Sequence, residues 1–120
     1  MIDLEIVQEE VINLINNKNC FLDELPDDFN FKNDIGIVAK VGDSIQDNFY
    51  REDMTLELRL VGLKINKIEI QKLARSYETL LNKYYFENSN ARIVKQNAFY
   101  TSYLDGDKLN IVLQFYILNY

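Results

Sequence analysis

The chain has 120 residues, of which 48% are hydrophobic and 27% charged, a balance typical of one folded domain that excludes wholesale disorder. Aspartate and glutamate number 19 against 13 lysines and arginines, so the net charge is −6 and sequence-specific nucleic-acid binding is not expected. The chain has no histidine and a single cysteine, Cys20, which excludes Ser-His-Asp and Cys-His catalytic groups, zinc knuckles and iron–sulfur clusters.

The expected location is intracellular. No apolar run approaches the roughly 18–20 residues that a membrane span requires. The first five residues, MIDLE, carry acids where a signal peptide carries basic residues. We therefore expect a single domain over residues 1–120 that is made in a cytoplasm and has no membrane partner. Cys20 is flanked by Phe21 and Leu22 and is expected to be a small core residue.

The first half of the chain is predicted to contain one helix and one strand. Residues 4–17 favour a helix, because apolar side chains recur at helical spacing, and the asparagine-rich residues 16–19 would end it. Residues 21–28 indicate a short extended segment and a turn, because Pro26 forces the preceding residue toward extended geometry. Residues 35–41 are rich in β-branched side chains and predict a strand. The polar, acidic residues 42–53 form a long connection, the tip of a hairpin.

Residues 54–61 give the clearest strand signal in the chain. Apolar and polar side chains alternate, so one face would meet the core and the other would be wet or covered by a partner. A second helix should begin at Asn66, with a capping box between Asn66 and Glu69, and end within residues 84–87. Its apolar positions are Ile70, Leu73, Tyr77, Leu80, Leu81 and Tyr84.

Two strands close the chain, at residues 91–104 and 109–119. The sequence Asp-Gly-Asp-Lys at residues 105–108 predicts a hairpin turn, since glycine supplies the positive φ that a tight turn needs. The element order is α-β-β-α-β-β. It predicts an α+β two-layer domain with a mainly antiparallel four-stranded sheet and two helices on one face. The expected core includes Leu14, Leu56, Leu58, Leu73, Leu80 and Ile111.

Carboxylates are the chemical groups that remain for catalysis or metal binding. They form two clusters, at residues 23–28 and at residues 43–53. Neither cluster has the spacing of an EF-hand loop, and solvated acidic loops are the ordinary interpretation. A hydrolase with paired carboxylates is a conceivable third interpretation. We expect no enzyme activity, no cofactor and no metal.

The final strand points to a protein interface. Residues 109–120 contain no charged side chain, no proline and no glycine, and both faces of the strand are apolar. Such a strand must lie inside the sheet, because an exposed one would aggregate. Its second face could be covered by the helices or the long loop of the same chain, but a partner subunit is the favoured interpretation. The expected interface residues are Phe49, Tyr50, Phe99, Tyr100, Tyr103, Tyr116 and Tyr120.

Three stretches carry a resemblance to a known family: residues 21–28, residues 54–62 with the helix that follows, and the closing hairpin from residue 98 to the end. In this order they resemble the tail-terminator family of long-tailed phages, including the minor capsid or tail-completion proteins. The resemblance implies a structural protein of the virion neck, assembled in the host cytoplasm. It implies a homo-oligomeric ring, usually of six subunits, which caps the tail tube protein and joins it to the head–tail connector.

A different class of protein fits the charge as well. A small acidic inhibitor, such as an immunity or anti-defence protein, could block a basic, nucleic-acid-binding target. Self-association distinguishes the two functions, because a terminator must form a closed ring and an inhibitor need not. If the ring is right, the closing hairpin and the acidic hairpin loop are expected to build the interface between subunits.

Overall fold

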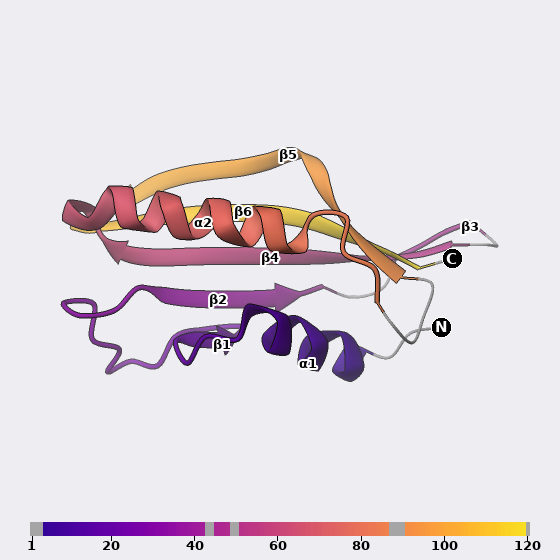
Figure 1. The fold of residues 1–120 in the computed structure, drawn as a ribbon, viewed down its shortest axis with the longest axis horizontal. Coiled ribbons are helices and arrows are strands. Elements are labelled where there is room, and N and C mark those ends of the chain that lie inside the picture. The colour runs from indigo at the N-terminus through magenta and orange to yellow at the C-terminus, as the bar shows by residue number, and fades with distance from the viewer. Residues whose placement is uncertain (1–3, 43–44, 49–50, 87–90, 120) are drawn as a thin grey trace.

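The computed structural model describes residues 4–42, 45–48, 51–86 and 91–119 of the chain. Its elements are α1 (Leu4–Ile15), β1 (Cys20–Leu22), β2 (Gly36–Val41), β3 (Ile45–Asn48), β4 (Arg51–Leu63), the 3-10 turn η1 (Lys64–Asn66), α2 (Lys67–Leu81), β5 (Ala91–Asp105) and β6 (Lys108–Asn119). The fold is α+β, as expected, and the described residues place two helices beside one sheet (Figure 1).

Over the described residues the sheet has six strands, so the prediction of four was too small. The two additional strands are β1 and β3, which span only three and four residues. β1 pairs in parallel with β2, and β3 pairs with the start of β4. Strands this short contain too few residues for alternation to be recognised, and their backbone pairing is decided by the strands beside them.

The long strands form the order β1-β2-β4-β6-β5, with β3 attached to β4. β6 lies between β4 and β5 and is antiparallel to both. The prediction that this apolar strand lies inside the sheet is therefore confirmed. The turn before it is also confirmed, because Gly106 has a φ of 64° and joins the paired residues Asp105 and Lys108.

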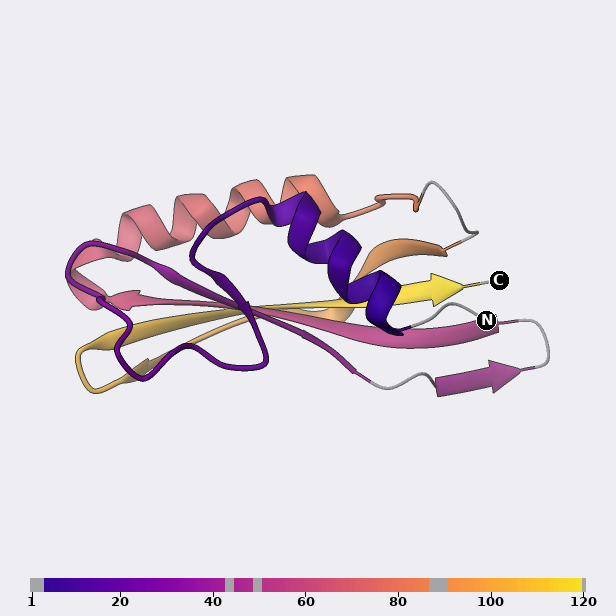
Figure 2. The same ribbon diagram turned by 90° about the horizontal axis from the view of Figure 1, so that it is seen from below.

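Both helices lie on the same side of the sheet (Figure 2). α1 packs on β1 and β2, whereas α2 packs on β4 and β6. The face of β4 that meets the helices carries Leu56, Leu58 and Leu60, as the alternation predicted. The adjoining face of β6 carries Ile111, Leu113 and Phe115, and these side chains form one core with the buried faces of the helices. Neither described helix has the length and apolarity of a membrane span.

The predicted core is partly correct. Leu56, Leu58 and Ile111 are fully buried, and Leu14 and Leu73 are half-buried against the core. Leu80 is 40% exposed, so its predicted burial was wrong. The buried stripe of α2 is Ile70, Ala74, Tyr77 and Leu81, and the sheet beneath the helix decides which side of a broad apolar stripe is covered.

The ends of the helices correct two further predictions. Asn66 occupies the N-cap position of α2 but makes no side-chain cap hydrogen bond, so the capping box is wrong. α2 ends at Leu81 rather than within residues 84–87, because the Lys83 amide donates to the Ile93 carbonyl at 2.7 Å. This hydrogen bond pairs the chain with β5 and draws it away from the helix axis. α1 ends as expected, at an asparagine with positive φ, Asn16.

The second face of the sheet is covered in part by the same chain. The segment 23–35 crosses it, since a Cβ built on Gly36 would lie 2.7 Å from Leu25. Phe29 packs edge-on against Phe21 and Phe31, and the Phe31 ring lies 5.0 Å from the Lys108 ammonium.

β6 is buried on this second face as well. Val112 and Leu118 are only 7% and 9% exposed, although they point away from the helices. Covering these two residues therefore requires no partner subunit, so the favoured interpretation was wrong for them and cover within one chain, the alternative, holds. Tyr116, on the same face, is 40% exposed.

Candidate functional site

Several exposed apolar side chains lie where α2 begins and where the β5–β6 hairpin turns. Ile65 is 84% exposed and Ile68 is 64% exposed. Across from them on β5, Leu104 is 60% exposed and Tyr100 is 49% exposed. Single exposed apolar residues are ordinary on a protein surface, but a contiguous group marks an interaction site.

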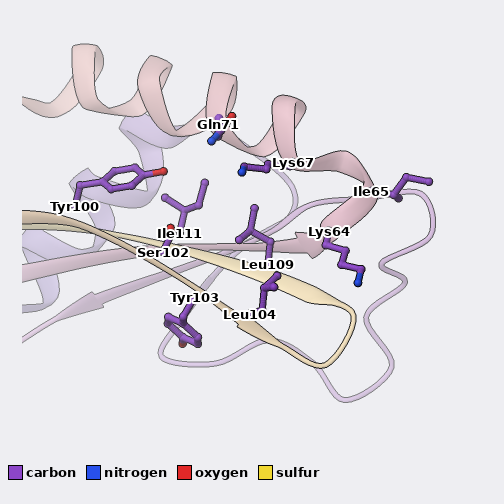
Figure 3. Close-up of a pocket in the computed structure, with 10 residues that line it drawn as sticks. All are labelled: Lys64, Ile65, Lys67, Gln71, Tyr100, Ser102, Tyr103, Leu104, Leu109 and Ile111. Carbon is purple, nitrogen blue, oxygen red and sulfur yellow. The ribbon is translucent and has the colours of Figure 1, made fainter.

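Ile65, Tyr100 and Leu104 line a groove with a volume of about 690 Å³ between α2 and the β5–β6 hairpin (Figure 3). Leu109 and Ile111 of β6 form its floor, while Lys67 and Gln71 reach toward it from α2. The lining residues are Lys64, Ile65, Lys67, Gln71, Tyr100, Ser102, Tyr103, Leu104, Leu109 and Ile111. We refer to this feature as the α2–β5 groove.

The groove exists because the sheet extends beyond the helix that covers it. α2 packs on β4 and β6, and β5 lies one strand farther out at the edge of the sheet. On β5, Tyr100, Ser102 and Leu104 pair with buried core residues of β6, so they share the face that carries the helices. No helix among the described elements packs over this half of β5, so its side chains and the flank of α2 form two walls.

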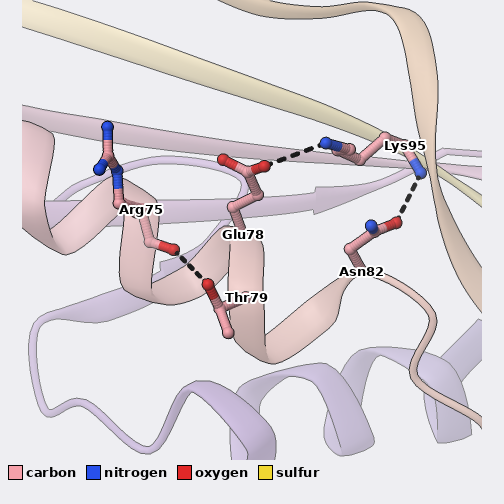
Figure 4. A network of polar contacts seen from close by, with 5 residues as sticks. All are labelled: Arg75, Glu78, Thr79, Asn82 and Lys95. Carbon is pink, nitrogen blue, oxygen red and sulfur yellow. Dashed lines mark hydrogen bonds and ion pairs between the residues drawn. The ribbon is translucent and has the colours of Figure 1, made fainter.

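The α2–β5 groove continues toward the C-terminal end of α2. A second hollow of about 490 Å³ shares Gln71 and Tyr100 with the first and adds Arg75, Glu78 and Phe99. Here a polar network ties β5 to the helix (Figure 4).

In this network the Lys95 ammonium lies 3.0 Å from Glu78, and the Lys95 amide donates to the side-chain carbonyl of Asn82 at 3.3 Å. Thr79 donates to the Arg75 carbonyl within α2. The two contacts of Lys95 connect the walls at the end of the groove away from Ile65.

The groove has a positive electrostatic character in an acidic protein. The lining of the 690 Å³ part includes Lys64 and Lys67 and no acidic side chain. The adjoining part is lined by Arg75 and by Glu78, whose carboxylate is paired with Lys95. The whole chain carries a net charge of −6. Within a Debye length of about 10 Å at 0.1 M salt, these basic groups attract a negatively charged partner.

The structure separates the predicted interface residues. Tyr100 and Tyr103 both border the groove, but the Tyr103 ring points to the other side of the hairpin (Figure 3). Phe99 is half-buried against Phe115, with ring centroids 5.4 Å apart, so it is mainly a packing residue. Tyr116 is exposed on the second face. The remaining three, Phe49, Tyr50 and Tyr120, lie outside the described residues.

Sequence reasoning did not single out Lys64 and Ile65, which lie in η1 between β4 and α2. Together with Lys67, the first residue of α2, they form the basic end of the groove. One signal was available: Ile65 and Ile68 do not belong to the apolar stripe of α2 that faces the sheet. Apolar residues outside the buried stripe of an amphipathic helix indicate a second contact surface.

Cys20 does not have the character of a catalytic nucleophile. Burial raises the pKa of its thiol from 9.0 to about 11, so it is protonated at physiological pH. Burial also raises the pKa of Tyr77, whose hydroxyl accepts a hydrogen bond from Asn17 at 3.2 Å and links α2 to the segment that follows α1. The described residues include no group of three or more Cys, Asp or Glu side chains placed to hold a metal ion.

The α2–β5 groove thus combines an apolar floor with aromatic and basic walls. Its walls are suited to taking up a short segment of protein that carries both apolar and acidic side chains. Comparison of the chain with models of known protein families, and with curated proteins, gives no match in either case.

Proposed function

We propose that this protein is a structural subunit of a phage neck or tail, which assembles into a ring that caps the tail tube and joins it to the head connector. The observation that carries the proposal is the exposed, aromatic-lined α2–β5 groove on a domain of only 120 residues. The order of the long elements and the closing hairpin, on which the resemblance to tail-terminator proteins rests, supports the same function.

The groove supports docking because its exposed side chains are of the kind that anchor interfaces. Tyr100 supplies a large, stiff aromatic surface, and Ile65 and Leu104 supply apolar area that a partner would remove from water. Interface energy is concentrated in a few such anchors, and truncating one commonly weakens association by about 2 kcal/mol or more. A ring repeats the contact around its circumference, so a modest contact is enough to close it.

The charge of the chain is compatible with a ring around DNA. A net charge of −6 repels phosphate, so the inner wall of such a ring would let DNA pass without holding it. The basic residues of the groove would be buried between subunits and would not face the channel. The proposed ring has six subunits, as in the family that the sequence resembles.

Light scattering and electron microscopy test this function. The parent, alone or mixed with tail tubes, should give a species several times the mass of one chain, with ring-shaped class averages. Tyr100→Ala combined with Leu104→Ala should give a smaller species whose circular dichroism spectrum matches the parent. Ile6→Ala is the matched control, because Ile6 is 55% exposed on α1, outside the groove.

A parent that stays strictly monomeric, with and without tail tubes, would contradict the ring. That result would favour the second function, an acidic inhibitor of a basic nucleic-acid-binding protein, for which the net charge is the supporting observation.

A further inference from the structure

The α2–β5 groove and the β3–β4 hairpin lie at opposite ends of the molecule. β4 runs for 13 residues between them, which is about 40 Å at the usual rise of a strand. At one end β4 pairs with β3 through Ile45 and Asp53, and at the other end Leu63 pairs with Lys108 beside the groove. The longest extent of the molecule is 47 Å, and Figure 1 shows β3 at the far end from the start of α2. A hairpin cannot therefore reach the groove of its own chain.

The two ends have opposite charge. The hairpin sequence, residues 43–53, contains four acids against one arginine, a net charge of −3. It also contains the apolar residues Ile45, Phe49 and Tyr50. The groove presents Lys64 and Lys67 beside apolar floor residues. The hairpin sequence thus combines apolar residues with negative charge, and the groove combines apolar residues with positive charge.

We propose that the acidic β3–β4 hairpin of one copy occupies the α2–β5 groove of the next copy, and that this head-to-tail contact is what builds the ring. The inference rests on the proposed function, because it assigns the subunit contact that the function requires. A groove of about 690 Å³ lies within the range of sites that enclose a ligand of a few residues.

Head-to-tail contacts have a geometric consequence. The two surfaces differ, so each copy uses one to hold its neighbour on one side and the other to be held on the opposite side. Repetition closes a ring if the rotation between copies divides a full turn, and otherwise gives an open filament. The elongated shape of the chain, 47 by 26 by 21 Å, leaves these surfaces at the two ends of its long axis.

Charge reversal at both ends provides the test. The groove variant carries Lys64→Glu and Lys67→Glu, and both lysines are exposed, so the fold should tolerate the change. The hairpin variant carries Asp47→Lys and Glu52→Lys. Each variant should weaken self-association by roughly tenfold or more at low salt, because like charges would meet across the contact. The variant that combines all four changes should regain most of the parent association.

The matched control carries Lys18→Glu and Lys72→Glu, which change the net charge equally at exposed positions outside the groove lining. It should assemble like the parent. Circular dichroism verifies the fold of every variant, and light scattering at several protein concentrations measures association.

The outcomes separate this contact from the function itself. Loss of assembly in both single-end variants and recovery in the combined variant establish the contact. Rings that persist in the groove variant, or a combined variant that fails to recover, overturn the contact and leave the ring in place. A parent that forms no oligomer, alone or with tail tubes, overturns the proposed function as well.

Discussion

Truncation of Leu58 to alanine should destabilise the protein strongly. Leu58 lies in the middle of β4, is fully buried, and pairs with Ala39 of β2 and Leu113 of β6. The change removes three carbons, which is about 2.4 kcal/mol of transfer free energy at roughly 0.8 kcal/mol per methylene. The cavity that remains adds to this loss, and buried leucine-to-alanine changes reach about 5 kcal/mol. Because hydrogen-bonded strands flank Leu58 on both sides, the site cannot collapse easily, and we expect a loss of about 3–5 kcal/mol.

Leu80 provides the matched control for this substitution. Its apolar spacing on α2 resembles that of a core residue, yet it is 40% exposed. Leu80→Ala should lower the free energy of unfolding by at most about 1.5 kcal/mol, because the side chain is already partly in water and no closed cavity forms. For 120 residues a total stability of about 6–18 kcal/mol is typical, so the two variants differ by a measurable share of the whole.

Urea unfolding followed by circular dichroism is the assay. The variants are compared at one protein concentration, because self-association makes the apparent stability depend on concentration. The midpoint should fall much further for Leu58→Ala than for Leu80→Ala, with unchanged dependence on urea. Equal losses in the two variants would refute the assignment of the buried face of α2. A Leu58 variant that unfolds with the parent would refute the assignment of the core face of β4.

Three further predictions concern charge, the thiol and the hairpin turn. Binding of duplex DNA should be undetectable at micromolar protein and ~150 mM salt in a fluorescence anisotropy titration, and a micromolar Kd would contradict this expectation. Alkylation of Cys20 in the folded protein should rise with a midpoint near pH 11, whereas in urea it should rise near 9, because burial favours the neutral thiol. The stability that this thiol contributes is therefore complete below pH 9 and falls between pH 9 and about 11; a folded midpoint near 9 would be the contrary result. Gly106→Ala should lower stability by about 1–2 kcal/mol in thermal unfolding, since φ is 64° and no atom lies within 4 Å of an added Cβ, so only backbone strain acts. Gly106→Asn should lose less, and equal losses would contradict the strain argument.

The resemblance and the ring stay predictions, whereas much of the secondary structure could be derived from the sequence. The alternation of Leu56, Leu58 and Leu60 with polar residues predicted both β4 and its buried face. The Asp-Gly-Asp-Lys turn predicted the closing hairpin, and the apolar faces of β6 predicted its interior place in the sheet. These features depend on repeats along one strand or on the conformational preference of one residue, so they can be seen in the sequence itself.

Only the tertiary structure decided the remainder. β1 and β3 are strands because neighbouring strands pair with them, and three or four residues carry no periodic signal. The exposure of Leu80 and the end of α2 at Leu81 depend on how the helix is rotated over the sheet and on the pairing of Lys83 with Ile93. The α2–β5 groove arises for the same reason: Tyr100 was predicted to lie at an interface, but its place in one groove with Lys64 and Lys67 follows from a sheet that extends one strand beyond its helix. Contacts between segments far apart in the chain leave no local pattern, so they appear only when the strands and helices are assembled.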